Sequence, residues 1–197
     1  MHVTHPYLNP SPEARLHRQA FELCVKDLDN ALEYVEGHDM NLDVFSHRFY
    51  ELLLRSCTEF ESLAKTLLSA HGTDLKDNAT IRDYFPLAGM YCLTACHVFA
   101  TRWNPAPIRI SPFADWTAPT EGPSWYRAYN EVKHSRRANF GNASLRNVLS
   151  AVSAVMILLV QGYRPFFLGS TSSSTDVNRV ESLGFPDFPF VVQRPQS

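Results

Sequence analysis

The sequence predicts an all-α fold: an antiparallel helical bundle that carries a proline-rich insertion and ends in an irregular aromatic tail. Apolar residues recur at helical spacing over most of the 197 residues, residues typical of helix caps flank these stretches, and glycines and prolines separate them. The length and the 45% hydrophobic content suit one well-buried core. We therefore expect residues 1–197 to form a single domain with a helical core at 10–162.

Each predicted helix has its own start and stop signals. Ser11 is a suitable N-cap for a helix from residue 12 to about 35, and Gly37 lies where a left-handed C-cap is useful. Gly72 is the expected end of the second helix. The other helical stretches are expected at 42–70, at 80–100 with an interruption at 86–89, at 125–137 and at 143–161.

Two irregular segments interrupt this pattern. Residues 103–123 contain five prolines around the alternating stretch 108–110, which indicates an insertion loop with a small hairpin. Ser124 follows as an N-cap, and Asn139 with Gly141 supplies the next helix stop. The remainder, 163–197, has a Ser/Thr run at 170–175 and proline-spaced phenylalanines, so we expect an extended tail that docks its Phe side chains.

The composition limits location and partners. The first 12 residues contain no apolar secretory signal, and the longest apolar run, 148–160, is shorter than the roughly 20 residues that span a bilayer. We therefore expect a cytoplasmic protein without membrane association. The net charge of −2 excludes the class of proteins that cover nucleic acid with a uniformly basic surface. Free, buried thiols, as in a reducing compartment, are expected at Cys24, Cys57, Cys92 and Cys96.

The strongest functional signal is a polar stripe on the helix expected at 125–137. At about 100° per residue, Arg127 and His134 lie within roughly 20° of each other, and Asn130 lies about 40° from His134. A histidine exchanges protons near neutral pH, an arginine holds phosphate oxygens, and an asparagine orients either one. Because RNA supplies its own 2′-hydroxyl nucleophile, these groups suffice for phosphodiester cleavage without a metal or another cofactor.

Positive charge is concentrated in the same part of the chain. Residues 127–146 contain a single acid, Glu131, and five basic residues: Arg127, Lys133, Arg136, Arg137 and Arg146. Such a patch attracts a phosphate backbone. A histidine among lysines and arginines is also common on a solvent-exposed helix that has no function in binding or catalysis. The alternative is therefore a purely structural helical protein with a solvated basic patch.

Residues 125–137 resemble the signature helix of the HEPN superfamily, in which four to six residues separate an Arg from the His that follows it. Arg127 and His134 have six residues between them, and the acidic-then-lysine stretch 51–65 is similar to the helix that often precedes the signature. The resemblance covers roughly residues 10–162. It implies an all-helical protein of a toxin–antitoxin, phage-defence or RNA-processing system, with metal-independent endoribonuclease activity.

The resemblance also implies residue roles and an oligomeric state. Three residues are implied as catalytic: Arg127 as the phosphate clamp, Asn130 as the orienting residue and His134 as acid or base. Three others would hold the RNA backbone: Lys133, Arg136 and Arg137. Because HEPN ribonucleases generally face two signature helices across a dimer, a homodimer is expected.

One position departs from the family pattern. In HEPN proteins an Asn often follows the Arg directly, and matching Asn130 to it places Tyr129 at the Arg position. Arg127 must then reach in from half a turn earlier for the site to be active. The alternative is a non-catalytic HEPN-like module that binds RNA, a nucleotide or a partner protein in a toxin–antitoxin or defence complex.

Cys92, Cys96 and His97 form a further pattern with two interpretations. Their spacing is that of a partial zinc site, but the apolar residues around them are typical of a core, which is the favoured interpretation. Neither a glycine-rich phosphate loop nor a Gly-x-Ser-x-Gly elbow is present, so nucleotide hydrolysis and esterase chemistry have no motif.

Aromatic and acidic residues near the signature helix also have two interpretations. The tryptophans could stack on bases, but anchoring of the insertion is favoured for Trp103, Trp116 and Trp125. On the helix at 42–70, a solvated face is the expected setting for Glu59, Glu61 and Lys65. A role of these acids in positioning the signature helix is the alternative.

Overall fold

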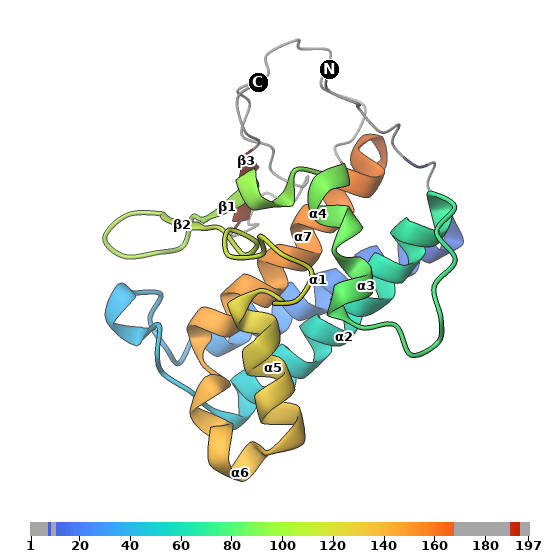
Figure 1. Ribbon diagram of the computed structural model, residues 1–197. Coiled ribbons are helices and arrows are strands. Elements are labelled where there is room, and N and C mark those ends of the chain that lie inside the picture. Colours follow the sequence, from blue (N-terminus) through green and yellow to red (C-terminus); the bar gives the residue numbers. More distant parts are fainter. Residues whose placement is uncertain (1–7, 9–10, 168–189, 194–197) are drawn as a thin grey trace.

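The computed structural model of the chain describes Leu8, residues 11–167 and residues 190–193. Helices form most of the described residues, so the predicted helical class is correct, and one small sheet accompanies them (Figure 1). Four helices are long: α1 (Pro12–Leu32), α2 (His47–Ala70), α5 (Ser124–His134) and α7 (Leu145–Phe167). The short elements are η1 (Asp39–Asn41), α3 (Ile81–Tyr84), α4 (Pro86–Met90), η2 (Leu93–Ala95), β1 (His97–Ala100), β2 (Ile108–Ile110), α6 (Arg136–Asn139), η3 (Phe140–Asn142) and β3 (Phe190–Gln193).

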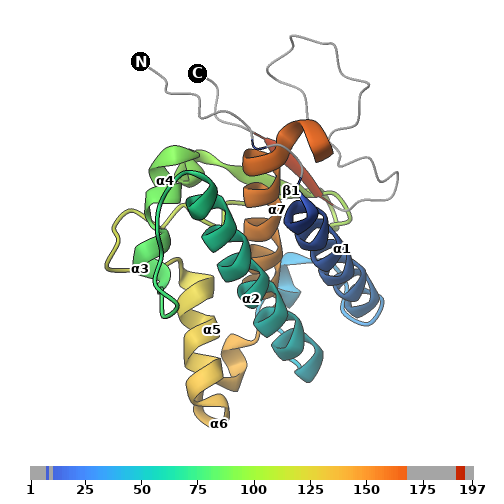
Figure 2. The ribbon, with the colours of Figure 1, turned by 90° about the vertical axis from the view of Figure 1, so that its right-hand side faces the viewer.

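The long helix α7 is the centre of the structure. α1, α2 and α5 all pack against it, and Figure 2 shows these helices gathered around it. Every side chain from residue 151 to residue 163 is buried. By length and composition the stretch Leu145–Tyr163 is apolar enough to span a membrane, but 83% of this apolar window is buried inside the protein. The apolar run noted in the sequence is therefore a core helix.

Two predicted helix ends are correct. The Ser11 side chain accepts a hydrogen bond from the backbone N–H of Ala14 (3.2 Å), so Ser11 is the N-cap of α1. Gly72 has a left-handed conformation (φ +79°) after the end of α2, and the Thr73 N–H donates to the Leu68 carbonyl (2.9 Å). Both signals act within about one helical turn, which is why the sequence reveals them.

Two other predicted helix limits are wrong. α1 ends before residue 35, and Gly37 is not its left-handed C-cap. A Cβ at Gly37 would lie 2.7 Å from the Arg102 carbonyl oxygen, so this glycine permits a close backbone approach instead. α2 begins at His47, with Ser46 as its N-cap, and not at residue 42.

The helix expected over 80–100 is wrong in its last part. Cys92 has a left-handed conformation (φ 50°), η2 follows, and 97–100 is the strand β1. β1 is the central strand of an antiparallel sheet in the order β2-β1-β3. The residues Val98 and Phe99 suit a strand, and pairing with the nearby β2 and with the distant β3 overrides the helical pattern. The strand expected at 108–110 is confirmed, but its partner lies before the insertion.

The predicted C-terminal tail is only partly confirmed. α7 continues to Phe167 across a break at Tyr163 (φ −131°, ψ 31°), so this helix is longer than the expected 143–161. Residues 190–193 are extended, as predicted, and form β3. The Ser/Thr run at 170–175 and the expected docking of the tail phenylalanines lie outside the described residues.

All four cysteines are free, but only three are buried. Burial raises the pKa of the Cys24 and Cys57 thiols, so these groups stay protonated and unreactive. Cys96 is also buried, and its Sγ lies 3.1 Å from Nε2 of Gln161. Cys92 is exposed, contrary to expectation, because the chain turns there. Over the described ranges no group of three His, Cys, Asp or Glu side chains is placed to hold a metal ion.

Phe60 on α2 is the hub of the aromatic core that anchors the insertion. It is fully buried, and the ring centroids of five neighbours lie within 6.4 Å of its own: Tyr84, Phe113, Trp116, Trp125 and Tyr126. The indole N–H of Trp125 donates to the Pro112 carbonyl (2.7 Å). Because all three tryptophans are at most 7% exposed, they serve as anchors and are not available to stack on bases.

The solvated helix face expected around Glu59 and Glu61 is wrong. Glu59 accepts a hydrogen bond from Nδ1 of the buried His17 on α1, and Glu61 accepts one from the Tyr126 hydroxyl of α5 (2.6 Å). Nε2 of His17 also lies 3.1 Å from the Thr66 hydroxyl oxygen. The two carboxylates therefore tie α2 to α1 and to α5.

The pairing of His17 with Glu59 is expected to stabilise the fold measurably. Glu59→Leu leaves a buried imidazole without its acceptor, and we expect it to lower the free energy of unfolding by about 2 kcal/mol. Glu59→Gln keeps an acceptor oxygen, so the loss should be less than about 1 kcal/mol. Urea denaturation followed by tryptophan fluorescence measures both. Equal losses in the two variants would contradict a hydrogen-bonding role for Glu59.

Candidate functional site

The helix α5 has a buried face and a polar face, as the sequence predicted. Five aromatic or apolar side chains of α5 are buried: Trp125, Tyr126, Ala128, Tyr129 and Val132. Arg127 and His134 are exposed, and Asn130 is partly buried. The rise of the helix separates Arg127 from His134 by about 10 Å along its axis. The polar stripe exists, but its two ends do not meet within one protomer.

Arg127 is held at the start of α5 by the insertion. Its Nη1 donates to the Gly122 carbonyl (2.8 Å), and its Nη2 lies 3.9 Å from a carboxylate oxygen of Asp115. The guanidinium is half-exposed, so these contacts orient it without burying it. Arg127 therefore points toward the insertion and away from His134, which lies two turns further along the helix.

Asp115 replaces Ser124 as the cap of α5. Its Oδ2 accepts a hydrogen bond from the Ser124 N–H (2.8 Å), and no side-chain bond from Ser124 caps the helix, so the predicted Ser124 cap is wrong. A carboxylate at a helix N-terminus also interacts favourably with the helix dipole. An acid nine residues away in an irregular loop gives no local signal, which is why the sequence did not reveal it.

The capping role of Asp115 can be tested with a matched pair of variants. Asp115→Ala is expected to lower the free energy of unfolding by about 1 kcal/mol, because one N–H of the first turn loses its acceptor. Asp115→Asn should lose only about 0.3 kcal/mol, since asparagine is an equally good cap. Urea denaturation measures the difference. If Asn were as destabilising as Ala, the cap would not be the stabilising contact.

The side chains of His134 and Asn130 have no polar partner among the described residues. Neither side chain makes a hydrogen bond or an ion pair within the described parts of the chain. His134 occupies the last turn of α5, where a positive charge interacts favourably with the helix dipole. The imidazole is thus free to face a ligand.

Tyr129 and Lys133 form a pair one turn apart on α5. Tyr129 is 2% exposed, and its hydroxyl accepts a hydrogen bond from Nζ of Lys133 (3.0 Å). This bond raises the pKa of Lys133, so its ammonium group remains charged. Nζ also lies 5.0 Å from the centroid of the Tyr129 ring. A cation is therefore present beside position 129, although the residue at 129 is neutral.

The helix expected to run to residue 137 is broken after His134. Ser135 (φ −145°, ψ 68°) ends α5, and Arg136 begins the separate short helix α6. The Arg136 guanidinium carbon lies 4.3 Å from the ring centroid of Tyr50, and its Nη2 donates to Nδ1 of His47. Arg137 is exposed. No local pattern in the sequence points to His47 or Tyr50, because 89 residues separate Arg136 from His47.

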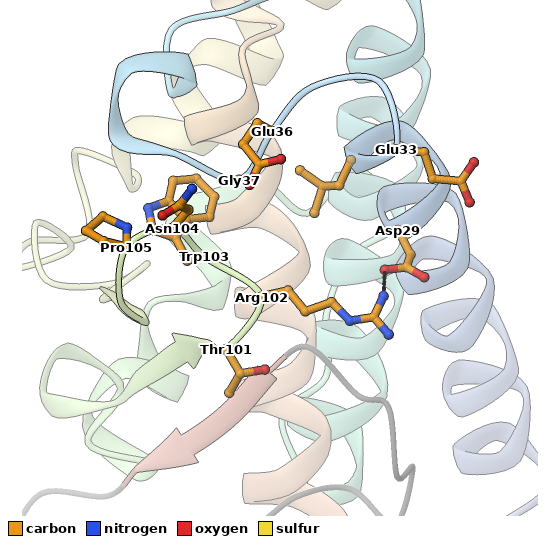
Figure 3. A pocket seen from close by; sticks show the side chains of 10 residues that line it. Asp29, Glu33, Glu36, Gly37, Thr101, Arg102, Trp103, Asn104 and Pro105 are labelled. Atoms are coloured by element: carbon orange, nitrogen blue, oxygen red, sulfur yellow. Dashed lines mark hydrogen bonds and ion pairs between the residues drawn. The ribbon is translucent and has the colours of Figure 1, made fainter.

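The two described cavities lie away from α5. One, of about 480 Å³, opens between the end of α1 and the segment after β1, where Glu33 and Glu36 flank an ion pair between Arg102 and Asp29 (2.6 Å; Figure 3). The other, of about 560 Å³, lies over the end of α2 near Lys65. Neither cavity is lined by a residue of α5.

Comparisons with protein-family models, with curated proteins and with solved structures find no match to this chain.

Proposed function

We propose that this chain is a HEPN-like, RNA-targeting protein that acts as a metal-independent endoribonuclease of a toxin or phage-defence system. The observation that carries the proposal is the free imidazole of His134, exposed at the end of α5 next to three cationic side chains: Lys133, Arg136 and Arg137. The buried thiols of Cys24, Cys57 and Cys96 fit a reducing, cytoplasmic setting.

The proposed reaction is an internal transesterification of RNA. The 2′-oxygen attacks the adjacent phosphorus and the bond to the 5′-oxygen breaks, which leaves a 2′,3′-cyclic phosphate and a 5′-hydroxyl. His134 removes the 2′-hydroxyl proton or supplies the proton to the leaving 5′-oxygen, and water exchanges the other proton. Arg127 stabilises the charge on the phosphoryl oxygens, and Asn130 orients the reacting groups. Lys133, Arg136 and Arg137 hold the flanking phosphates.

A homodimer is part of the proposal, because one protomer does not bring Arg127 and His134 together. The two groups are about 10 Å apart along the helix axis, and Arg127 is drawn toward the insertion. Two copies of α5 facing each other in opposite directions would place the imidazole of one copy near the guanidinium of the other. The cations of both copies would then line one cleft and attract RNA despite the net charge of −2.

The second candidate function is a non-catalytic module that binds RNA, a nucleotide or a partner protein such as an antitoxin. Two observations favour it: Tyr129, at the position where the family has its Arg, is buried, and Arg127 already has two partners in the insertion. A purified dimer that binds RNA without cutting it would support this alternative. A tightly co-purifying second protein would support a subunit of a larger defence complex.

The test is cleavage of a single-stranded RNA by the purified protein in excess EDTA. Products with 2′,3′-cyclic phosphate ends are expected, and the same oligonucleotide with 2′-O-methyl groups should remain intact because its nucleophile is blocked. Light scattering in the same buffer should report a dimer. Cleavage that requires a divalent metal, or that proceeds equally well on 2′-O-methyl RNA, would contradict the proposed mechanism.

A further inference from the structure

Five side chains at one end of the molecule form a cluster that we call the aromatic–arginine tip: Phe45, His47, Tyr50, Arg136 and Phe140. Phe140 is its hub, with ring centroids 5.6 Å from Phe45, 4.9 Å from His47 and 6.2 Å from Tyr50. The start of α2 and the α6 helix, which supply most of the tip, lie at the same end of the molecule in Figures 1 and 2.

The Arg136 guanidinium is held in a fixed orientation within the tip. Its carbon lies 4.3 Å from the Tyr50 ring centroid and 5.4 Å from that of Phe140, so aromatic rings lie against it. Because arginine only donates, Nδ1 of His47 must accept the hydrogen bond from Nη2. A guanidinium has five N–H donors, so others remain for an incoming phosphate.

The tip presents aromatic surface to solvent. Phe45 is 52% exposed and Val44 before it is 37% exposed. The connection from α6 to α7 holds Phe140 against α5, because Asn142 Nδ2 donates to the Glu131 carboxylate (2.6 Å) and Asn139 Nδ2 to the Glu131 carbonyl (3.2 Å). The exposed ring surface therefore lies beside the last turn of α5, which carries His134.

The charges around the tip favour a polyanion as the occupant. The tip itself contains His47 and Arg136, and the helix ends that form it also carry four exposed basic side chains: Arg48, Lys133, His134 and Arg137. Three nearby carboxylates already have partners: Glu51 lies 3.7 Å from Arg48, Glu131 accepts from Asn142, and Asp43 pairs with Arg146 (3.0 Å). In the proposed dimer the positive charges of both copies meet in one cleft, and a polyanion bound there neutralises them.

We infer that the aromatic–arginine tip is a subsite that stacks an unpaired nucleobase of single-stranded RNA on Phe45 and Phe140 and binds its phosphate through Arg136. The inference deepens the proposed function, on which it rests for the identity of the RNA ligand. Aromatic rings accept any base by stacking, and an ordered arginine beside them holds the backbone. The tip would position the strand so that the next phosphodiester lies at His134.

The test measures binding of an uncleavable ligand, so that it does not depend on catalysis. Two fluorescent 2′-O-methyl oligonucleotides of about 12 nucleotides are used, one with adenine bases and one abasic with the same number of phosphates. Fluorescence anisotropy at fixed ionic strength gives their dissociation constants. The wild-type protein is expected to bind the adenine strand about tenfold more tightly than the abasic strand.

Substitutions then assign this difference to the tip. Phe45→Ala removes a half-exposed ring and should weaken binding of the adenine strand about fivefold while leaving the abasic strand unaffected. Arg136→Lys keeps the charge but loses the flat guanidinium, and should weaken binding of both strands about threefold. Tyr34→Ala, which removes an aromatic side chain that is 88% exposed near the end of α1, is the matched control and should change neither. Thermal melting checks that each variant is folded.

The inference is overturned by equal affinity of the wild type for the two strands, or by Tyr34→Ala having the same effect as Phe45→Ala. It is also overturned if Phe45→Ala changes the oligomeric state without changing RNA binding, since the tip would then be an interface between copies. The two proposals fail separately: RNA cleavage without any base dependence of binding removes only the tip subsite, and base-dependent binding without cleavage removes only the nuclease.

Discussion

Replacing His134 by alanine is expected to lower the rate of RNA cleavage between about 100-fold and 10,000-fold, the usual contribution of a general acid or base. The side chain is exposed and makes no hydrogen bond within the described residues, so its removal should leave the stability of the protein unchanged. A loss of activity in this variant would therefore be a loss of chemistry. Single-turnover cleavage of a labelled RNA in EDTA measures it.

The His134 experiment has a matched control in His38. This histidine lies before η1, far from α5 in the sequence, and its Nδ1 accepts only a backbone N–H, that of Met40 (3.1 Å). His38→Ala should keep the wild-type cleavage rate, and added imidazole should partly restore His134→Ala. Equal rates in wild type and His134→Ala would show that the imidazole takes no part in cleavage.

Phe60→Ala is expected to lower the free energy of unfolding by about 3 to 5 kcal/mol, the largest stability effect we anticipate. Phe60 is fully buried, and its ring contacts side chains from α2's neighbours α3 and α5 and from the insertion. Its removal leaves a cavity where these segments meet. Because Trp125 loses its closest aromatic partner (5.1 Å), the orientation of α5 and of its polar stripe should loosen as well.

Two further variants serve as controls for the expected loss of stability in Phe60→Ala. Phe60→Leu refills most of the volume and should lose less than about 2 kcal/mol. Leu16→Ala, at a site that is 64% exposed on α1, should change the free energy of unfolding by less than about 0.5 kcal/mol. Urea denaturation of all three under one set of conditions gives the comparison. A Phe60→Ala protein no less stable than Leu16→Ala would refute the role of Phe60 as the hub.

The amino-acid sequence by itself determined the local features of this protein. The N-cap at Ser11, the left-handed stop at Gly72 and the division of α5 into a buried face and a face with Arg127 and His134 all follow from residues within a few positions of each other. Helical periodicity and capping act over about one to two turns, so they can be inferred without knowing the fold.

Only the tertiary structure decided which distant groups meet. Strand β1 exists because two segments from elsewhere in the chain pair with it, and Arg127 is turned toward the insertion by Asp115 and Gly122. The stacking of Arg136 on Tyr50 likewise depends on the break at Ser135 and on the packing of the helices. Whether their partners are near or far in the sequence, the free energy of these contacts depends on the relative position of whole segments, which no local pattern encodes.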